Sequence, residues 1–141
     1  MTLRGIGIDV ASIERFYALV ERHDDHDWLV RRWFSRDAIC ATTAPELAVQ
    51  LTTRFAAKEA VWKALGLNPD RPVPWREIVV RPSRAPGLLV VQLDGRLDLE
   101  AQSCGVTKIS VTHTRFGDLI VAVALAEATA TARTLLNKAP F

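Results

Sequence analysis

The chain has 141 residues, of which 49% are hydrophobic and 24% are charged, and its formal net charge is +2. This length suits one domain around one core, so we expect a single domain over residues 1–141. The charge gives general nucleic-acid binding no support, and no apolar run is long enough to cross a membrane. The first residues lack the apolar core of a signal peptide. We expect a cytoplasmic protein that binds neither nucleic acid nor membrane.

A β-strand is predicted first, over residues 3–10, because apolar side chains alternate along it. The face opposite Ile6 and Ile8 carries two glycines and one carboxylate, namely Gly5, Gly7 and Asp9. Glycine within a strand often marks the close approach of a ligand or of another backbone. Asp9 therefore either faces such an approach or caps the helix that follows, and both interpretations stay open.

Two short helices are expected next, over residues 12–20 and 28–34. Between them lies the polar segment His23–Asp27, which contains two His and three Asp. We interpret it as a solvated connection and not as a metal cluster, because metal ligands are usually held on rigid elements. Cys40 and Cys104 have no metal-ligand spacing, and we expect both to be small buried residues in a reducing compartment.

The longest predicted helix begins at the capping box Thr43–Glu46, with Pro45 in its first turn, and ends at Gly66. Its large apolar side chains fall on one helical stripe, formed by Leu47, Leu51, Phe55, Trp62 and Leu65. We expect the rest of the chain to be organised around this helix.

Four charged residues interrupt that stripe or its edge: Arg54 and Lys58 are four apart, and so are Glu59 and Lys63. One interpretation is an exposed Glu–Lys pair beside two cations whose stems cover apolar surface. The other is a functional site, because several cations beside a carboxylate suit a phosphate-bearing ligand and a bridging metal.

Beyond Gly66 a proline-rich loop covers residues 67–74. Strands are then predicted over residues 75–80, 88–93, 106–114 and 119–126, with a helix over 96–103, and residues 126–141 form a last helix or a tail. The strand over 119–126 is apolar almost throughout, which is typical of an interior strand. This order predicts an α+β fold, in which a mostly antiparallel sheet wraps the long central helix.

His113 lies near the end of its predicted strand, on the side of Ile109 and Val111. Considered alone, it is either a partly buried histidine with its hydrogen bonds satisfied or a functional group.

Three segments together resemble the holo-acyl-carrier-protein synthases, the small 4′-phosphopantetheinyl transferases. They are Gly5–Val10 followed by Ile13–Phe16, then Arg54–Ala60 with Lys63–Gly66, then Ile109–Thr114. The resemblance covers nearly the whole chain and the middle segment is the most specific. It implies the 4′-phosphopantetheinyl transferase fold of the single-unit type.

The resemblance implies a reaction and its residues. The phosphopantetheine arm of coenzyme A moves to a serine hydroxyl of an acyl carrier protein, adenosine 3′,5′-bisphosphate leaves, and Mg²⁺ is required. By position, Asp9 and Glu59 are the metal ligands, and Lys63 contacts the diphosphate. These three are the expected catalytic residues, and Glu59 is our choice of general base.

The remaining expected contacts to coenzyme A are Arg54, Lys58, His113 and Thr114, with three of them (all but Lys58) near the nucleotide end. The family also implies a homotrimer with sites at subunit boundaries. The carrier partner is expected to present an acidic helix to four arginines: Arg15, Arg22, Arg31 and Arg32. Two departures from the family pattern, His23–Asp27 and Leu67–Pro69, bear on carrier choice and on the adenine pocket.

Two other functions stay open from the residues alone. The chain is either a subunit that binds coenzyme A or a nucleotide without transfer, or an oligomerisation module in which the charges of the long helix form salt bridges between subunits.

Overall fold

The computed structural model describes residues 1–22, 27–34, 37 and 39–129. Its elements are β1 (Thr2–Ser12), α1 (Ile13–Arg22), α2 (Asp27–Trp33), α3 (Ala44–Leu65), the 3₁₀ turn η1 (Trp75–Glu77), β2 (Ile78–Pro82), β3 (Leu88–Leu93), α4 (Gly95–Ser103), β4 (Lys108–Phe116) and β5 (Leu119–Ala128). The predicted loop at residues 23–27, apart from Asp27, lies outside the described residues. A last helix or tail is predicted over residues 126–141, but residues 126–128 continue β5, and residues from 130 onward lie outside the described residues.

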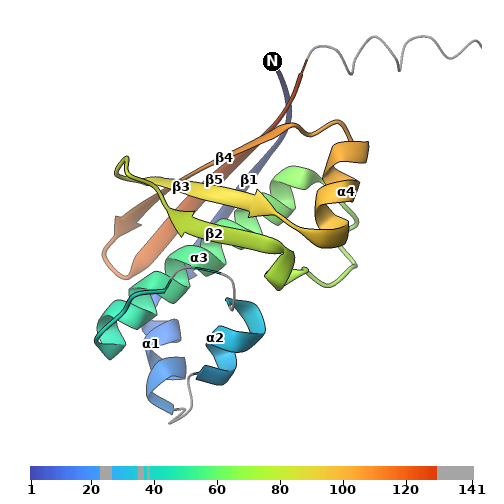
Figure 1. Cartoon of the computed structure of the whole chain (residues 1–141). Coiled ribbons are helices and arrows are strands. Elements are labelled where there is room, and N and C mark those ends of the chain that lie inside the picture. The colour runs from blue at the N-terminus through green and yellow to red at the C-terminus, as the bar shows by residue number, and fades with distance from the viewer. Residues whose placement is uncertain (23–26, 35–36, 38, 130–141) are drawn as a thin grey trace, which may run out of the picture.

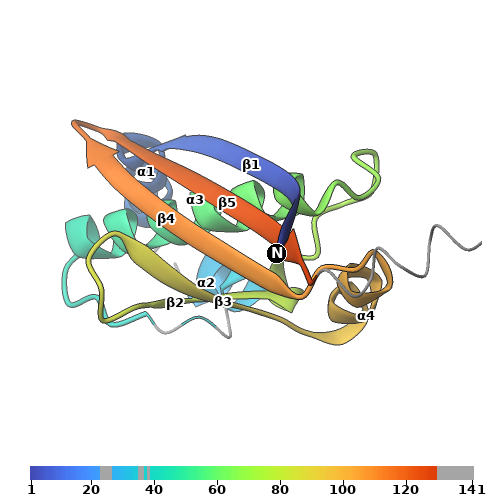
Figure 2. The same ribbon diagram turned by 90° about the horizontal axis from the view of Figure 1, so that it is seen from above.

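The five strands form one sheet in the order β1-β5-β4-β3-β2, and every neighbouring pair is antiparallel. Helices α1, α2 and α3 lie together on one face of this sheet, whereas α4 lies beside the end of β3 (Figure 1). Seen from above, β1, β5 and β4 run across α3 (Figure 2). The predicted α+β fold, with a long helix against an antiparallel sheet, is confirmed.

Helix α3 has the predicted ends. Thr43 accepts a hydrogen bond from the backbone N–H of Glu46, and Gly66 closes the helix with φ of 62°. The returning contact of the capping box is displaced by one residue, because the Glu46 carboxylate accepts from the N–H and the hydroxyl of Thr42. Both ends of the helix are thus fixed locally by its own sequence.

The buried surface of α3 is wider than the single apolar stripe that we expected. The sheet, α1 and β2 pack around the helix, so that residues on most sides of it are buried, including small residues such as Ala56, Ala57 and Ala60. Alanine lets the strands approach the helix backbone, which is why the buried surface extends well beyond the large side chains.

Strand β1 makes the closest approach. A Cβ atom on Gly5 or Gly7 would collide with the backbone carbonyls of Ala64 and Ala60, so only glycine fits there. The approaching group is therefore the α3 backbone and not a ligand. Because alternate residues share a face, Asp9 also points toward the α3 side of β1.

The opposite face of the sheet is apolar and exposed. Its exposed large apolar side chains come from four strands, namely Ile6, Ile8 and Val10 on β1, Leu119 and Leu125 on β5, Phe116 on β4, and Leu88 and Val90 on β3, and β4 adds the polar Thr112 and Thr114. Within the described ranges no helix covers this face (Figure 2). Strand β5 is apolar on both faces and lies between β1 and β4, so its predicted interior position is confirmed.

Two details of the sequence prediction are wrong. Cys40 and Cys104 are exposed, because Cys40 lies in the connection before α3 and Cys104 directly follows α4 on the surface. Residues 75–77 form a 3₁₀ turn, and the strand begins only at Ile78. Of the helices that the structure describes, none is long and apolar enough to cross a membrane.

Candidate active site

Asp9, Glu59 and Lys63 form the first polar cluster on α3. Lys63 Nζ donates to Asp9 Oδ1 at 2.8 Å and to the backbone carbonyl of Ile8 at 3.1 Å. The Asp9 side chain is 14% exposed and that of Lys63 is 47% exposed, so the cluster opens to solvent on the lysine side. Asp9 does not cap α1. The structure thus joins β1 to the last turns of α3 through two of the predicted catalytic residues.

In this cluster two carboxylates, Asp9 and Glu59, share one positive charge, that of Lys63. Burial raises the pKa of the Glu59 carboxyl, and the nearby Asp9 carboxylate raises that pKa further, while Lys63 lowers it. Asp9 Oδ2 is buried and has no hydrogen-bond partner. A buried acceptor without a donor is costly, and two carboxylates that repel each other add to that cost. A cation placed between the two carboxylates would relieve both.

The donor set fits Mg²⁺. Within the described ranges there is no group of three or more His, Cys, Asp or Glu side chains arranged around a metal position. Asp9 and Glu59 supply two carboxylates, and Mg²⁺ typically takes one or two carboxylates and completes its shell with phosphate oxygens and water. These two residues could therefore hold the ion only together with a phosphate-bearing ligand.

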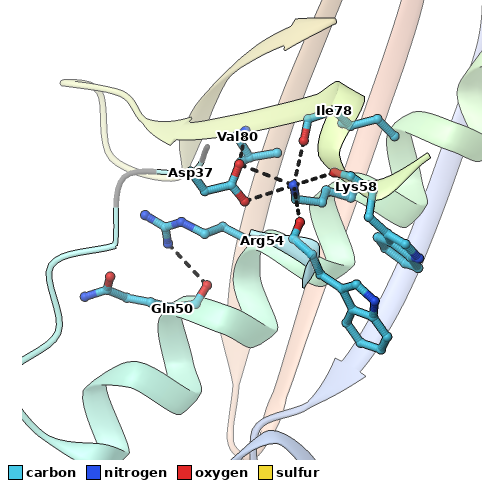
Figure 3. Close-up of polar contacts among 8 residues, drawn as sticks. Asp37, Gln50, Arg54, Lys58, Ile78 and Val80 are labelled. Atoms are coloured by element: carbon cyan, nitrogen blue, oxygen red, sulfur yellow. Dashed lines mark hydrogen bonds and ion pairs between the residues drawn. The ribbon is translucent and has the colours of Figure 1, made fainter. Parts of the chain in front are cut away.

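Lys58 belongs to a second and different cluster (Figure 3). Its side chain is 1% exposed, and Nζ donates to the backbone carbonyls of Trp33, Trp75 and Ile78 at 3.0, 2.8 and 2.6 Å. The same nitrogen lies 3.0 Å from Asp37 Oδ2. An ammonium has three protons, so its donor capacity is used within the chain. This position conflicts with the expected contact between Lys58 and coenzyme A.

Asp37 is the partner that sequence reasoning missed. Its Oδ1 accepts from the backbone N–H of Val80 at 2.9 Å, and the side chain is buried. Burial raises the pKa of the Asp37 carboxyl and lowers the pKa of the Lys58 ammonium, while their mutual attraction opposes both shifts. The one sequence signal was that Lys58 falls within the buried stripe of α3, where a lysine needs a counter-ion.

Arg54 and His113 lie near each other beside this second cluster. The Arg54 side chain is buried and its Nη1 donates to the carbonyl of Gln50 at 3.2 Å. Burial lowers the pKa of His113, the charge of Arg54 lowers it further, and the carbonyl of Gly87 raises it. His113 Nδ1 is buried without a hydrogen-bond partner. The histidine is therefore not satisfied within the chain, and its imidazole is biased toward the neutral form.

Thr114 does not lie with His113. Strand β4 alternates, so His113 shares the inner face with Val111, while Thr114 lies on the outer face and is exposed. The two neighbouring residues thus face opposite sides of the sheet.

The two clusters lie toward opposite edges of the sheet. Lys63 bonds to residues of β1, whereas Lys58 bonds to Ile78 of β2, and β1 and β2 are the two outermost strands. Residues 54 and 58 on one side and 59 and 63 on the other also differ by roughly 140° around a helix. The two clusters are therefore separate from each other around α3.

The four arginines expected to meet a carrier are all exposed. Arg15 and Arg22 lie on α1, and Arg31 and Arg32 lie on α2. The Arg32 guanidinium lies over the ring of Trp28, 5.7 Å from its centre. Helices α1 and α2 both lie at the end of the molecule away from α4 (Figure 1), on the same face of the sheet.

Comparison with known proteins identifies the family of the chain. Residues 5–124 match the model of the 4′-phosphopantetheinyl transferase superfamily. The holo-[acyl-carrier-protein] synthase of Micrococcus luteus is 33% identical over 125 residues, which cover 87% of this chain and 90% of the relative.

Solved structures show the same fold. The synthase of Neisseria meningitidis superposes with a TM-score of 0.70 at 25% identity and covers 89% of this chain and 99% of its own. The synthase of Helicobacter pylori, solved in complex with coenzyme A, has a TM-score of 0.60 at 20% identity and covers 86% of this chain and 99% of its own. The chain thus belongs to the 4′-phosphopantetheinyl transferase superfamily and, within it, to the holo-[acyl-carrier-protein] synthases.

Proposed function

We propose that this chain transfers the 4′-phosphopantetheine arm of coenzyme A to a serine hydroxyl of an acyl carrier protein or carrier domain, in a Mg²⁺-dependent reaction that releases adenosine 3′,5′-bisphosphate. The observation that carries the proposal is the cluster of Asp9, Glu59 and Lys63, in which a buried carboxylate oxygen has no partner. Family membership supplies the reaction class, and this cluster supplies the groups that the reaction needs.

Asp9 and Glu59 would hold the metal. When bound, the ion supplies positive charge to the diphosphate and to the oxygen that leaves it. The unpartnered Asp9 Oδ2 and the raised pKa of Glu59 support this assignment, because both are relieved by a cation. Lys63, half exposed and now paired with Asp9, would turn to the diphosphate once Asp9 serves another cation.

Glu59 is the general base of this proposal. A carboxylate whose pKa is raised accepts a proton more readily than an ordinary one, and burial beside Asp9 has that effect here. It would take the proton of the carrier serine directly or through a water. The nucleophile belongs to the partner, so the chain needs no nucleophilic residue of its own.

Arg54 and His113 would bind the nucleotide end, with Thr114 at its border. The unpartnered Nδ1 of His113 supports a role in binding an anion, since a nearby phosphate would favour the protonated imidazole, whose Nδ1–H would donate to a phosphate oxygen. Lys58 would support this end from within the fold and not by contact.

We further propose that the site is completed between copies of the chain, in a homotrimer. Asp9 and His113 are both register partners of Ala122 on β5, so they lie two strands apart on the inner face of the sheet, and a second copy of the chain would border the site that they share. The exposed apolar face of the sheet supports association, because contiguous apolar surface of this kind marks interfaces.

The carrier would dock on α1 and α2. Exposed Arg15, Arg22, Arg31 and Arg32 offer a positive surface, and family carriers present an acidic helix. Electrostatic complementarity of this type speeds association and selects partners.

The proposal is tested by intact-mass analysis of a panel of apo carriers incubated with the chain, coenzyme A and Mg²⁺. We expect one carrier or more to gain roughly 340 Da, the mass of the phosphopantetheine group. Addition of a chelator should abolish the gain, and Mg²⁺ in excess should restore it. No gain on any carrier would contradict the proposal.

Two alternatives give different results in the same experiments. A subunit that only binds coenzyme A would show a ligand-induced rise in melting temperature without any mass gain on the carriers. An oligomerisation module would show neither. The structure favours a ligand site over salt bridges between subunits, because Lys58 and Lys63 already pair within the chain, with Asp37 and Asp9 respectively.

A further inference from the structure

We infer that Asp118, in the turn between β4 and β5, is a positioning residue that fixes the first turn of α1 and thereby aims the carrier-docking arginines at the catalytic cluster. The inference rests on the proposed function for the identity of the docking surface. It concerns a residue that does not touch the reacting groups.

Asp118 contacts the start of α1 three times, although it lies about a hundred residues away in sequence. Its backbone carbonyl accepts from the N–H of Ile13 at 2.8 Å, and its Oδ1 accepts from the N–H of Glu14 at 2.8 Å. Its Oδ2 accepts from the Ser12 hydroxyl at 2.6 Å, and the Ser12 Oγ in turn accepts from the N–H of Arg15 at 3.2 Å.

These bonds cap the helix. The first N–H groups of any helix lack partners within it, and here Asp118 serves two of them and orients the Ser12 hydroxyl that serves the third. A carboxylate at a helix N-terminus is also favoured by the helix dipole. Ser12 would be an ordinary cap by itself, but here it caps the helix together with Asp118 of the hairpin.

Side-chain packing alone does not fix the start of α1 against the β4–β5 hairpin. A cavity of about 720 Å³ lies at this place, lined by Glu14 and Tyr17 of α1, by Val49 of α3, and by Arg115 and Asp118 of the hairpin. The principal packing contact of α1 is with α3 and not with the sheet. The hydrogen bonds of Asp118 therefore link the β4–β5 hairpin directly to the start of α1.

The position of this link gives it a functional consequence. Ser12 lies three residues after Asp9, so the capped corner joins the strand that carries the catalytic carboxylate to the helix that carries Arg15 and Arg22. If this corner loosens, the docking arginines lose their fixed direction relative to Asp9, while the residues that meet coenzyme A keep theirs. Loss of Asp118 should thus weaken carrier recognition and leave coenzyme A recognition unchanged.

The experiment compares Asp118→Ala, Asp118→Asn and the unaltered chain. Asp98→Ala, which removes the same charge from α4 at the other end of the molecule, is the matched control (Figure 1). In Asp118→Ala, amide exchange at Glu14 and Arg15 should speed up and the KM for the carrier should rise on the order of fivefold to tenfold, the effect of a lost cap. The KM for coenzyme A should change less than about twofold.

Asp118→Asn should restore both readouts nearly to normal, because its amide keeps an acceptor for Glu14 and can donate to Ser12. Unchanged exchange in Asp118→Ala would overturn the inference, and so would faster exchange with an unchanged carrier KM. If the unaltered chain transfers nothing, the proposed function fails; carrier affinity by direct titration then decides the inference in place of KM, with the same two outcomes.

Discussion

The two polar clusters on α3 use the same kinds of side chain and have different fates. Lys58 and Asp37 are almost fully buried, and the ammonium is surrounded by three backbone carbonyls and both carboxylate oxygens of Asp37. Lys63 and Asp9 lie at an open edge, and the carboxylate keeps one oxygen without a partner. The two clusters differ in whether both carboxylate oxygens lie close to the ammonium: Asp37 Oδ2 lies 3.0 Å from Lys58 Nζ, whereas Lys63 meets only Oδ1 of Asp9.

The largest expected effect comes from disrupting the cluster of Asp9, Glu59 and Lys63, called the open cluster below. Glu59→Gln keeps the shape of the side chain and removes both the base and one metal ligand, so the transfer rate should fall on the order of 10²- to 10⁴-fold. Initial rates from intact-mass analysis measure this, with circular dichroism as the control for folding. A fall of less than about tenfold would remove Glu59 from the mechanism.

Disrupting the cluster of Lys58 and Asp37, called the closed cluster below, should lower the stability of the fold instead. Lys58→Met leaves Asp37 as a buried charge without a partner, which should lower the free energy of unfolding by about 3–5 kcal/mol. Urea denaturation measures it. The double variant Lys58→Met/Asp37→Asn should recover part of the loss, because the amide keeps an acceptor for the Val80 N–H and carries no charge.

The folded fraction of Lys58→Met provides the sharper comparison. If Lys58 only supports the fold, the affinity of folded Lys58→Met for coenzyme A should stay within about twofold of that of the unaltered chain. A loss of tenfold or more without loss of stability would restore Lys58 to the ligand site.

Much of the closed cluster could not be predicted from the sequence. The capping signals at Thr43 and Gly66 located α3 because they act within a few residues, and alternation placed His113 on the inner face of its strand. Asp37 has no such local signal, since its partners are a residue of α3 and the N–H of Val80, brought close only by tertiary packing. The exposure of Cys40 and Cys104 was missed for the same reason.

The catalytic cluster was predictable in part. The glycines of β1 indicated a close approach, but the sequence did not reveal whether a ligand or a backbone made it, and the α3 carbonyls turned out to fill that place. That Arg54 and Lys58 lie apart from Glu59 and Lys63 follows from helix geometry, yet only the sheet order shows that the two pairs turn toward opposite edges.

A moderate effect should appear in the pH dependence of nucleotide binding. Burial and Arg54 hold the pKa of His113 below its usual value in the free chain, and a bound phosphate should raise it. Binding then takes up a proton, so affinity for adenosine 3′,5′-bisphosphate should rise as the pH falls toward the lowered pKa.

Calorimetric titration between about pH 5.5 and 7.5 measures this dependence against His113→Gln, which removes the titration of the side chain and keeps that of the phosphate. The difference between the two chains isolates the histidine. Parallel pH profiles would show that His113 does not meet the ligand.

The smallest effect concerns the stability of the free chain. The pKa of Glu59 is higher in the folded chain than in the unfolded one, so the folded state binds this proton more tightly. The free energy of unfolding therefore loses a contribution as the pH rises from the ordinary glutamate value through the raised one. Without metal, Glu59→Gln should melt slightly above the unaltered chain at neutral pH and level with it at acid pH. A lower melting temperature of Glu59→Gln at neutral pH would contradict a destabilising charge on Glu59.

The most direct test of the account is the affinity for Mn²⁺, a spectroscopic substitute for Mg²⁺, measured by electron paramagnetic resonance in the presence of coenzyme A. The account predicts that Asp9→Asn and Glu59→Gln each weaken Mn²⁺ binding by about tenfold or more, because each removes one of two carboxylate ligands. The control Asp98→Ala should bind as the unaltered chain does. Equal affinity in all four chains would show that Asp9 and Glu59 do not share a metal, and the proposed site would be wrong.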